Sequence, residues 1–423
     1  MNIIESQILK EKLYQNQYPC GLRVFVMPKV GYDKKYAMFA THFGSINDDF
    51  IHPETKEEIK VPDGVAHFLE HKLFSQKDGS AMDKFAAMGS SSNAYTSFTH
   101  TSYLFSCTEG FDDSFKLLLD FVQNPYITDE SVENEKGIIG QEIRMYEDDA
   151  DWQLYFNFIN CLYNSHPVKK DIAGTIETIS HIDRELLYKC FKTFYDPSNM
   201  VIFVVGDVKP EDIFKMVEEN VDVNKEALKI EQKTTEEEAK ISEAKKEVSL
   251  EVALPMFIYG FKTGIDYEDI MKEEIAVNIA FEMLCGKSSE LYQNLYENGL
   301  LTSPLGIDVT FEREYSFISL AGESENPNEA IQKIKDEIIK MKNNEIDGEA
   351  FERIRKRLMG EYIRQFNSVD KIAHMFMNNI MRDVNILEYI DKYSEVTKDD
   401  VKKALDKYFN IEYEATSIVN PKA

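Results

Sequence analysis

The alternation of apolar and polar positions predicts a chain of short strands and amphipathic helices in mixed order. Runs of β-branched and aromatic residues predict strands, and apolar residues at helical spacing predict helices. Strands are expected at 22–28, 35–44, 92–108 (a pair), 200–206, 254–262, 305–311, 315–321 and 415–419. Helices are expected at 64–74, 80–88, 112–123, 128–162, 181–194, 212–220, 268–285, 288–298, 327–342, 348–366, 370–381 and 397–408.

The same order of elements occurs twice, once on each side of a charged segment at 222–247. This segment is rich in Glu and Lys and poor in aromatic residues, which predicts an exposed linker. We therefore expect an α+β protein with two structurally similar αβ-sandwich domains, each with helices packed on a mixed or antiparallel sheet. The domains are expected at 1–221 and 248–423, and a length of 423 residues suits two domains.

Composition narrows the class of partner and the location of the protein. The net charge of −27 argues against binding nucleic acid or an anionic membrane through the general surface. The five cysteines are scattered without a Cys-x-x-Cys pair, which favours reduced thiols. The sequence has no run of about 18 apolar residues and no basic, apolar start, so we expect a cytoplasmic location.

Residues 64–74, GVAHFLEHKLF, place the motif His-x-x-Glu-His on a predicted helix. Because each helical residue turns about 100°, His67 and His71 share one face and Glu70 lies beside them. Neutral imidazoles are preferred zinc ligands, and a neighbouring carboxylate can take a proton from water. The motif alone could also be a salt-bridged surface turn, so its interpretation depends on a further ligand downstream.

Two glutamates on a second predicted helix could supply that ligand. Glu135 and Glu142 are seven residues apart, and two helical turns bring them to within about 20° of one face. Either could complete a site of two histidines and one carboxylate that leaves a position for water. For each glutamate taken alone, the alternative is a solvated surface side chain, as we interpret Glu147.

The segment GVAHFLEH, followed about 70 residues later by EKGIIGQE, resembles the pitrilysin/insulinase/mitochondrial-processing-peptidase family of zinc peptidases. The resemblance implies that His67, His71 and Glu142 bind one zinc ion per chain. It also implies that Glu70 is the general base and that Glu135 is a supporting carboxylate of the catalytic centre.

The similarity to this family is strong over 20–205 and faint beyond 250. The chain length and the segment GIIGQEIRMYEDDADWQLYF are similar to those of a short, two-domain bacterial cytoplasmic subgroup. The segment SNAYT at 92–96 resembles the family's edge strand beside the metal. The resemblance implies that this strand binds an extended peptide substrate by β-augmentation. The substrate-binding residues would be Asn93, Ala94, Tyr95 and Thr96.

One departure from the family pattern concerns substrate binding. Family members supply an Arg-x6-Tyr pair from the C-terminal domain, but the aligned positions hold Pro304 and Phe311. Nearby candidates either have the wrong spacing or fall on a predicted helix: Arg313 and Tyr315, and Arg355 and Tyr362. We therefore expect a homodimer, or a heterodimer with a homologous subunit, in which the partner contributes the Arg/Tyr pair.

These features together predict a zinc metalloendopeptidase or processing peptidase that hydrolyses extended, unfolded peptides and includes peptide maturation among its roles. Two alternatives belong to other functional classes. One is a non-catalytic subunit of the same fold, and the other is an accessory subunit that binds a peptide or a modification enzyme. Non-catalytic members of the family lose a ligand or the base, whereas His67, Glu70, His71 and Glu142 are all present here.

Overall fold

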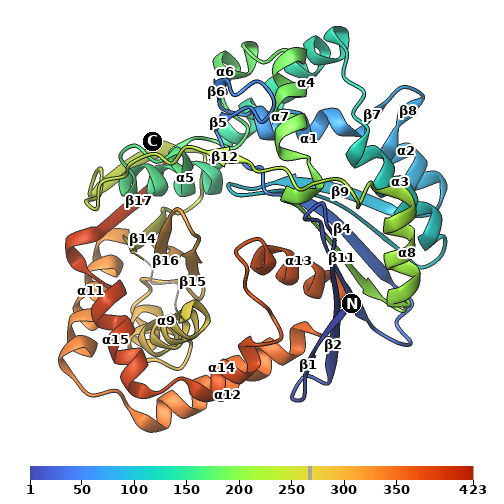
Figure 1. Ribbon diagram of the computed structural model, residues 1–423. Helices are drawn as coiled ribbons and strands as arrows, with labels where there is room; N and C mark the ends of the chain where they lie inside the picture. Colours follow the sequence, from blue (N-terminus) through green and yellow to red (C-terminus); the bar gives the residue numbers. More distant parts are fainter. Residues whose placement is uncertain (265–268, 423) are drawn as a thin grey trace. The chain divides into compact units, whose positions relative to one another are not determined.

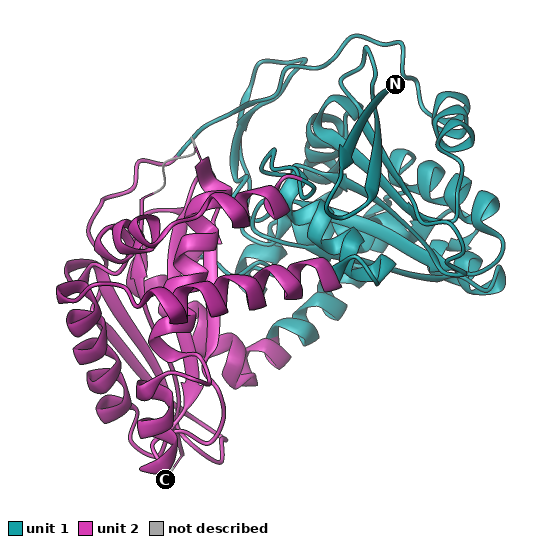
Figure 2. Cartoon of the chain, turned by 90° about the horizontal axis from the view of Figure 1, so that it is seen from below, with its two compact units in different colours: residues 1–143, 170–234, 365–387 teal, residues 144–169, 235–364, 388–423 magenta. Residues whose placement is uncertain are grey.

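The computed structural model describes residues 1–264 and 269–422, which form two compact units (Figure 2). Unit 1 contains 1–143, 170–234 and 365–387, and unit 2 contains the described residues of 144–169, 235–364 and 388–423. We expected contiguous domains at 1–221 and 248–423 with a linker at 222–247. The contacts instead divide that linker after Thr234 and give each unit one segment from the other half of the sequence.

Unit 1 is built on a seven-stranded sheet (Figure 1). The pair β3–β11 is parallel and the other pairs are antiparallel. Strand β11 is apolar and buried throughout, as expected for a strand covered on both faces. In spatial order the strands are β1 (Asn2–Ser6), β2 (Glu11–Gln17), β3 (Arg23–Pro28), β11 (Met200–Gly206), β4 (Lys35–Thr41), β10 (Thr101–Cys107) and β9 (Ser91–Thr96). Strand β9 is therefore an edge strand.

Helices cover both faces of this sheet. On one face, Phe74 from α1 (Val65–Phe74) packs 5.9 Å from Tyr103 of β10, measured between ring centroids. Helix α3 (Phe111–Gln123) lies on the same face. On the opposite face, Phe376 from α13 (Val369–Ile380) stacks on Phe203 of β11 with ring centroids 3.9 Å apart. A helix from the second half of the sequence thus completes the core of unit 1.

Unit 2 contains a five-stranded sheet that also has helices on both faces. In spatial order its strands are β13 (Lys245–Leu250), β17 (Glu414–Pro421), β14 (Met256–Lys262), β16 (Ser316–Glu323) and β15 (Gly306–Phe311). Helix α5 (Ala150–Leu162), from the first half of the sequence, packs on one face through Phe158 and Phe317, whose ring centroids are 5.8 Å apart. The opposite face is covered by α9 (Ile270–Cys285), α11 (Pro327–Asn343) and α15 (Lys398–Tyr408).

Five further helices follow the expected order. They are α2 (Ala81–Ala87), α7 (Arg184–Phe194), α8 (Pro210–Asn220), α10 (Glu290–Glu297) and α12 (Gly348–Gln365). Of the helix expected at 268–285, residue 268 lies outside the described residues. All five cysteines are buried, and none forms a disulfide. Within the described ranges, every helix is too short or too polar to span a lipid bilayer.

The single helix expected at 128–162 is wrong, because the chain forms α4 (Asp129–Asp148) and then α5. Asp149 between them has an extended backbone, and its carboxylate accepts a hydrogen bond of 2.8 Å from the Trp152 N–H. Asp is a favoured N-cap residue, so Asp149 ends one helix and begins the next. The break matters because α4 belongs mainly to unit 1 and α5 to unit 2.

Several elements have no counterpart in the expected pattern. The hairpin β1–β2 precedes the first expected strand, and β13 begins in the segment expected to be a linker and ends beyond it. Their sequences are polar, and they pair at the margins of larger sheets where one face meets solvent. The others are β5 (Asp49–Ile51), β6 (Glu58–Lys60), β7 (Ser75–Gln76), β8 (Gly79–Ser80), β12 (Glu231–Gln232), α6 (Ile176–Ser180) and α14 (Tyr389–Glu395).

Candidate metal centre

Helix α1 carries the His-x-x-Glu-His motif and is buried against the sheet of unit 1. It begins after Gly64, whose φ of +92° lies in the left-handed region. A Cβ at Gly64 would lie 2.5 Å from the Ala173 carbonyl oxygen, so only glycine fits this start. Asp63 does not cap the helix; its carboxylate pairs with Lys170 Nζ at 2.8 Å. Phe68 and Leu69 are fully buried and hold α1 in place.

Three side chains from α1 and α4 converge on one small volume. His67 Nε2 lies 3.7 Å from one carboxylate oxygen of Glu142, and His71 Nε2 lies 3.6 Å from the other. The three ligand atoms all lie within 4.8 Å of one another. Two imidazole nitrogens and one carboxylate oxygen are a zinc ligand set that leaves a fourth position for water. The donor set therefore fits a zinc ion.

Glu135, two turns before Glu142 on α4, holds the far side of His71. Its Oε1 lies 3.1 Å from His71 Nδ1, and its Oε2 accepts a hydrogen bond of 2.9 Å from Lys72 Nζ. A proton on Nδ1 leaves Nε2 free as a ligand. Burial opposes charge on both groups, but their mutual hydrogen bond and nearby charges outweigh it. They raise the pKa of His71 and lower the pKa of Glu135.

Glu70 lies beside the ligands without joining them. Its side chain is buried, and burial raises its pKa to about 7, although the charge of His71 and a hydrogen bond from Thr96 oppose the shift. Thr96 Oγ1 donates that bond to Glu70 Oε2 at 3.2 Å. A carboxylate with a pKa near the working pH is suited to accept and return a proton. Burial and position thus give Glu70 the properties of a general base.

His67 differs from His71 in its surroundings. Burial and the neighbouring His71 lower the pKa of His67 to about 4, so its imidazole is neutral at physiological pH. Its Nδ1 is buried and has no hydrogen-bond partner among the described residues. A neutral imidazole is the form that binds a metal ion. Of the two histidines, His71 has a carboxylate, that of Glu135, to orient its ring, and His67 has none among the described residues.

The structure separates the four residues expected to bind substrate. Thr96 reaches the centre through Glu70, and the Ala94 N–H donates to Asn93 Oδ1 at 3.0 Å in an exposed position. Side chains alternate along a strand, so Tyr95 points to the face opposite Thr96. There its Oη lies 3.3 Å from His100 Nε2. The metal face of the edge strand thus carries Ala94 and Thr96.

Sequence reasoning missed Lys72, whose side chain is 2% exposed. A lysine directly after the last motif histidine, within an apolar flank, was the available signal. Arg355 and Tyr362, which have the family spacing, lie on α12 as expected. Arg355 Nη1 donates to the backbone carbonyls of Tyr393 and Ser394, both at 3.2 Å, so it has a structural role within unit 2.

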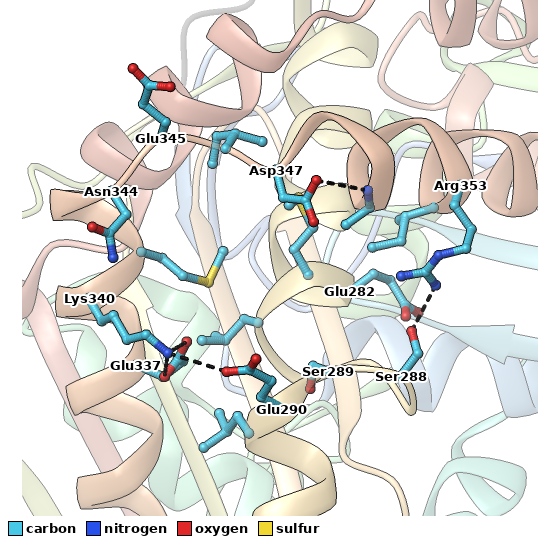
Figure 3. A pocket seen from close by; sticks show the side chains of 17 residues that line it. Glu282, Ser288, Ser289, Glu290, Glu337, Lys340, Asn344, Glu345, Asp347 and Arg353 are labelled. Atoms are coloured by element: carbon cyan, nitrogen blue, oxygen red, sulfur yellow. Dashed lines mark hydrogen bonds and ion pairs between the residues drawn. The ribbon is translucent and has the colours of Figure 1, made fainter.

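A cavity of about 330 Å³ lies in unit 2 among α9, α10, α11 and α12 (Figure 3). Lys340 Nζ lies 3.0 Å from Glu337 and 3.7 Å from Glu290, and Arg353 donates to Ser288 Oγ at 2.9 Å. Its described lining contains no histidine or cysteine. Because this lining offers no imidazole or thiolate ligand whereas unit 1 brings two imidazoles and a carboxylate together, we place the metal centre in unit 1.

Comparison with known proteins agrees with the geometry. The family described as insulinase (peptidase family M16) matches residues 55–176, and the peptidase M16 inactive domain matches residues 181–358. The uncharacterized zinc protease YmfH of Bacillus subtilis is 40% identical over 411 residues, which cover 96% of this chain and 95% of that protein. Zinc protease PqqE of Helicobacter pylori is 23% identical over 391 residues, which cover 87% of this chain and 85% of that protein.

Solved structures show the same fold over the whole chain. An M16-like peptidase from Alicyclobacillus acidocaldarius is 31% identical with a TM-score of 0.92, covering 97% of this chain and 99% of that chain. A protease from Helicobacter pylori is 23% identical with a TM-score of 0.82, covering 97% of this chain and 100% of that chain. The expected α+β class is confirmed. With its inverted zinc motif and its resemblance to zinc proteases along its length, the chain belongs to the insulinase (M16) family, in its short two-domain bacterial subgroup.

Proposed function

We propose that this chain is a zinc metalloendopeptidase that hydrolyses extended, unfolded peptides and carries one zinc ion. The observation that carries the proposal is the buried Glu70 beside three convergent ligand atoms, linked by Thr96 to an edge strand. His67, His71 and Glu142 would hold the ion, and Glu135 would orient His71. When bound, zinc supplies the Lewis acidity that polarises a carbonyl oxygen and makes water more acidic.

Glu70 would move the proton that hydrolysis requires. The Thr96 hydroxyl occupies Oε2, which leaves Oε1 to accept a proton from the attacking water. The same carboxyl would then deliver that proton to the leaving amine. Because Glu70 is buried, the transfer takes place away from bulk solvent. The burial of Glu70 therefore favours the same proton transfer to which its pKa is suited.

The free edge of β9 would align the substrate. An added strand would bond to outward-facing backbone groups such as the Ala94 N–H, displacing the local bond from Asn93 Oδ1. Residues opposite each other on neighbouring strands point to the same face, so a substrate residue opposite Thr96 would face the metal. Only an extended chain offers backbone groups in this way, which restricts the substrate to unfolded peptide.

The test combines metal content with cleavage of a quenched peptide library, with and without a chelator. We expect one zinc ion per chain and cleavage that chelation abolishes. Glu70→Gln should keep the zinc and lose cleavage by at least about 100-fold. Wild-type cleavage by Glu70→Gln would contradict the role of the base. Chelator-insensitive peptide binding without cleavage would instead identify an accessory subunit.

We further propose that a partner subunit completes the substrate site. Phe311 occupies the position at which the family carries a tyrosine. A phenylalanine has no hydroxyl to offer a substrate, and its side chain is buried in β15. A homologous subunit would contribute the Arg/Tyr pair, because a second copy of this chain carries the same Pro304 and Phe311. Such a pair of subunits suits a role in peptide maturation. The expected result is slow cleavage by the chain alone at low concentration and faster cleavage on adding the homologue. Full activity of the monomer would contradict the proposal.

A further inference from the structure

Lys72 is a fully buried lysine directly adjacent to a candidate metal ligand. Its side chain is 2% exposed, and its ammonium lies 2.9 Å from Glu135 Oε2 and 3.3 Å from Ser75 Oγ. Burying an ammonium group is unfavourable unless it is paired and hydrogen-bonded. A methionine or leucine would fill the same apolar flank of α1 without that cost. The role of this buried charge therefore follows from the two groups that Lys72 contacts, the Glu135 carboxylate and the Ser75 hydroxyl.

The two oxygens of Glu135 are divided between two neighbours on α1. Oε1 bonds to His71 Nδ1, and Oε2 bonds to Lys72 Nζ. The terminal torsion of a glutamate is broad, so one hydrogen bond leaves the carboxylate plane free to turn. Bonds to both oxygens hold that plane. The position of the His71 ring then depends on Lys72 as well as on Glu135.

His67 has no comparable support. Its Nδ1 is buried and finds no hydrogen-bond partner within the described parts of the chain. The orientation of the ligand set thus rests on one side of the centre, the contacts from Lys72 through Glu135 to His71. We propose that Lys72 is a positioning residue of the metal centre, which holds the carboxylate of Glu135 so that His71 Nε2 faces Glu142. The inference rests on the proposed zinc site.

The simpler alternative is that Lys72 only neutralises a buried glutamate and stabilises the fold. The two roles differ in what they predict for metal binding. A positioning role predicts weaker zinc binding when Lys72 is replaced, and the effect must pass through Glu135. A purely structural role predicts lower stability of the metal-free chain with zinc affinity unchanged.

The experiment compares Lys72→Met, Glu135→Gln and the double variant in the full chain. Zinc dissociation constants are measured by chelator competition, and Co²⁺ absorption spectra report the ligand geometry. We expect Lys72→Met to weaken zinc binding by about 10- to 100-fold, the usual effect of removing an outer partner of a metal ligand, and to alter the Co²⁺ spectrum. The double variant should bind zinc no more weakly than Glu135→Gln, because Lys72 acts through Glu135.

Lys29→Met is the matched control, since Lys29 is 9% exposed and pairs with Glu11 elsewhere in unit 1. It should lower stability and leave zinc affinity unchanged. Zinc affinity of Lys72→Met within about threefold of wild type would overturn the inference. So would zinc binding by the double variant that is weaker than zinc binding by Glu135→Gln, a comparison that does not need the Lys72→Met single variant. Failure of the wild-type chain to bind zinc would instead contradict the proposed function.

Discussion

The hydroxyl of Thr96 donates a hydrogen bond of 3.2 Å to Glu70 Oε2, although the two residues lie on different elements. Thr96 ends the edge strand β9, and Glu70 lies in the middle of α1. The bond joins the strand that would align a peptide to the carboxylate that would accept the proton. It also favours the ionised form of Glu70, against the stronger effect of burial.

We expect the acid limb of the pH–activity profile to reflect this bond. Glu70 has a pKa raised to about 7 by burial, so lowering the pH protonates it and removes its ability to accept a proton. Thr96→Val should raise the pKa further and move the limb by about 0.7 unit to higher pH, the equivalent of a 1 kcal/mol hydrogen bond. The pH dependence of the cleavage rate, measured at saturating zinc, tests this shift. Thr96→Ser, which keeps the hydroxyl, should restore the wild-type profile.

Glu70→Gln should stabilise the metal-free chain at alkaline pH. The pKa of Glu70 is higher in the folded chain than in the unfolded one, so stability falls as pH rises from about 4.5 to 7 and is lowest above that range. Replacing Glu70 with glutamine should raise the free energy of unfolding by on the order of 3 kcal/mol at pH 8 and by much less at pH 4.5. Denaturant midpoints with chelator present measure the difference. Equal effects at both pH values would contradict it.

Glu142→Ala should lose zinc affinity, because it leaves two histidine ligands of the three-ligand group found among the described residues. Metal content after dialysis and a competition assay measure the loss. The matched control is Glu133→Ala, which removes an exposed glutamate from the same helix whose carboxylate pairs with Lys136. If both variants retained zinc equally, the ligand role of Glu142 would be wrong.

Ala94→Pro should weaken substrate binding while leaving the metal centre intact. Proline removes the backbone N–H that faces the free edge of β9, where an added strand would bond. We expect kcat/KM to fall by about 10-fold, the equivalent of one to two hydrogen bonds. Unchanged zinc content and circular dichroism would show that the fold persists. An unaffected kcat/KM would argue against pairing along this edge.

Glu237→Gln should destabilise unit 2. Burial opposes the charge of Glu237, but the N–H groups of Asn164, Ser165 and His166 and the ammonium of Lys262 lower its pKa to about 2. Stability from this lowered pKa is present above about pH 4.5 and is lost as pH falls toward 2. The expected loss is about 2 kcal/mol at pH 7 and less at pH 3. The exposed neighbour Glu238→Gln should have little effect.

The sequence alone determined the contents of the candidate centre. Helical periodicity is local, so the spacing of His67, Glu70 and His71 placed them on adjoining faces before any tertiary contact was known. The seven-residue spacing of Glu135 and Glu142 worked in the same way. The resemblance to zinc peptidases assigned them different roles. In the structure, Glu142 faces both imidazoles and Glu135 lies behind His71.

Tertiary structure alone decided which long-range contacts support that centre. The bond from Thr96 to Glu70 and the pairing of Lys72 with Glu135 join elements whose separation in the chain leaves no periodic signal. The placement of α5 in unit 2 and of α13 in unit 1 likewise could not be predicted from the sequence. An amphipathic helix specifies an apolar face but not the sheet that covers it. Local spacing sets which side chains share a face, and packing of the whole chain sets what that face meets.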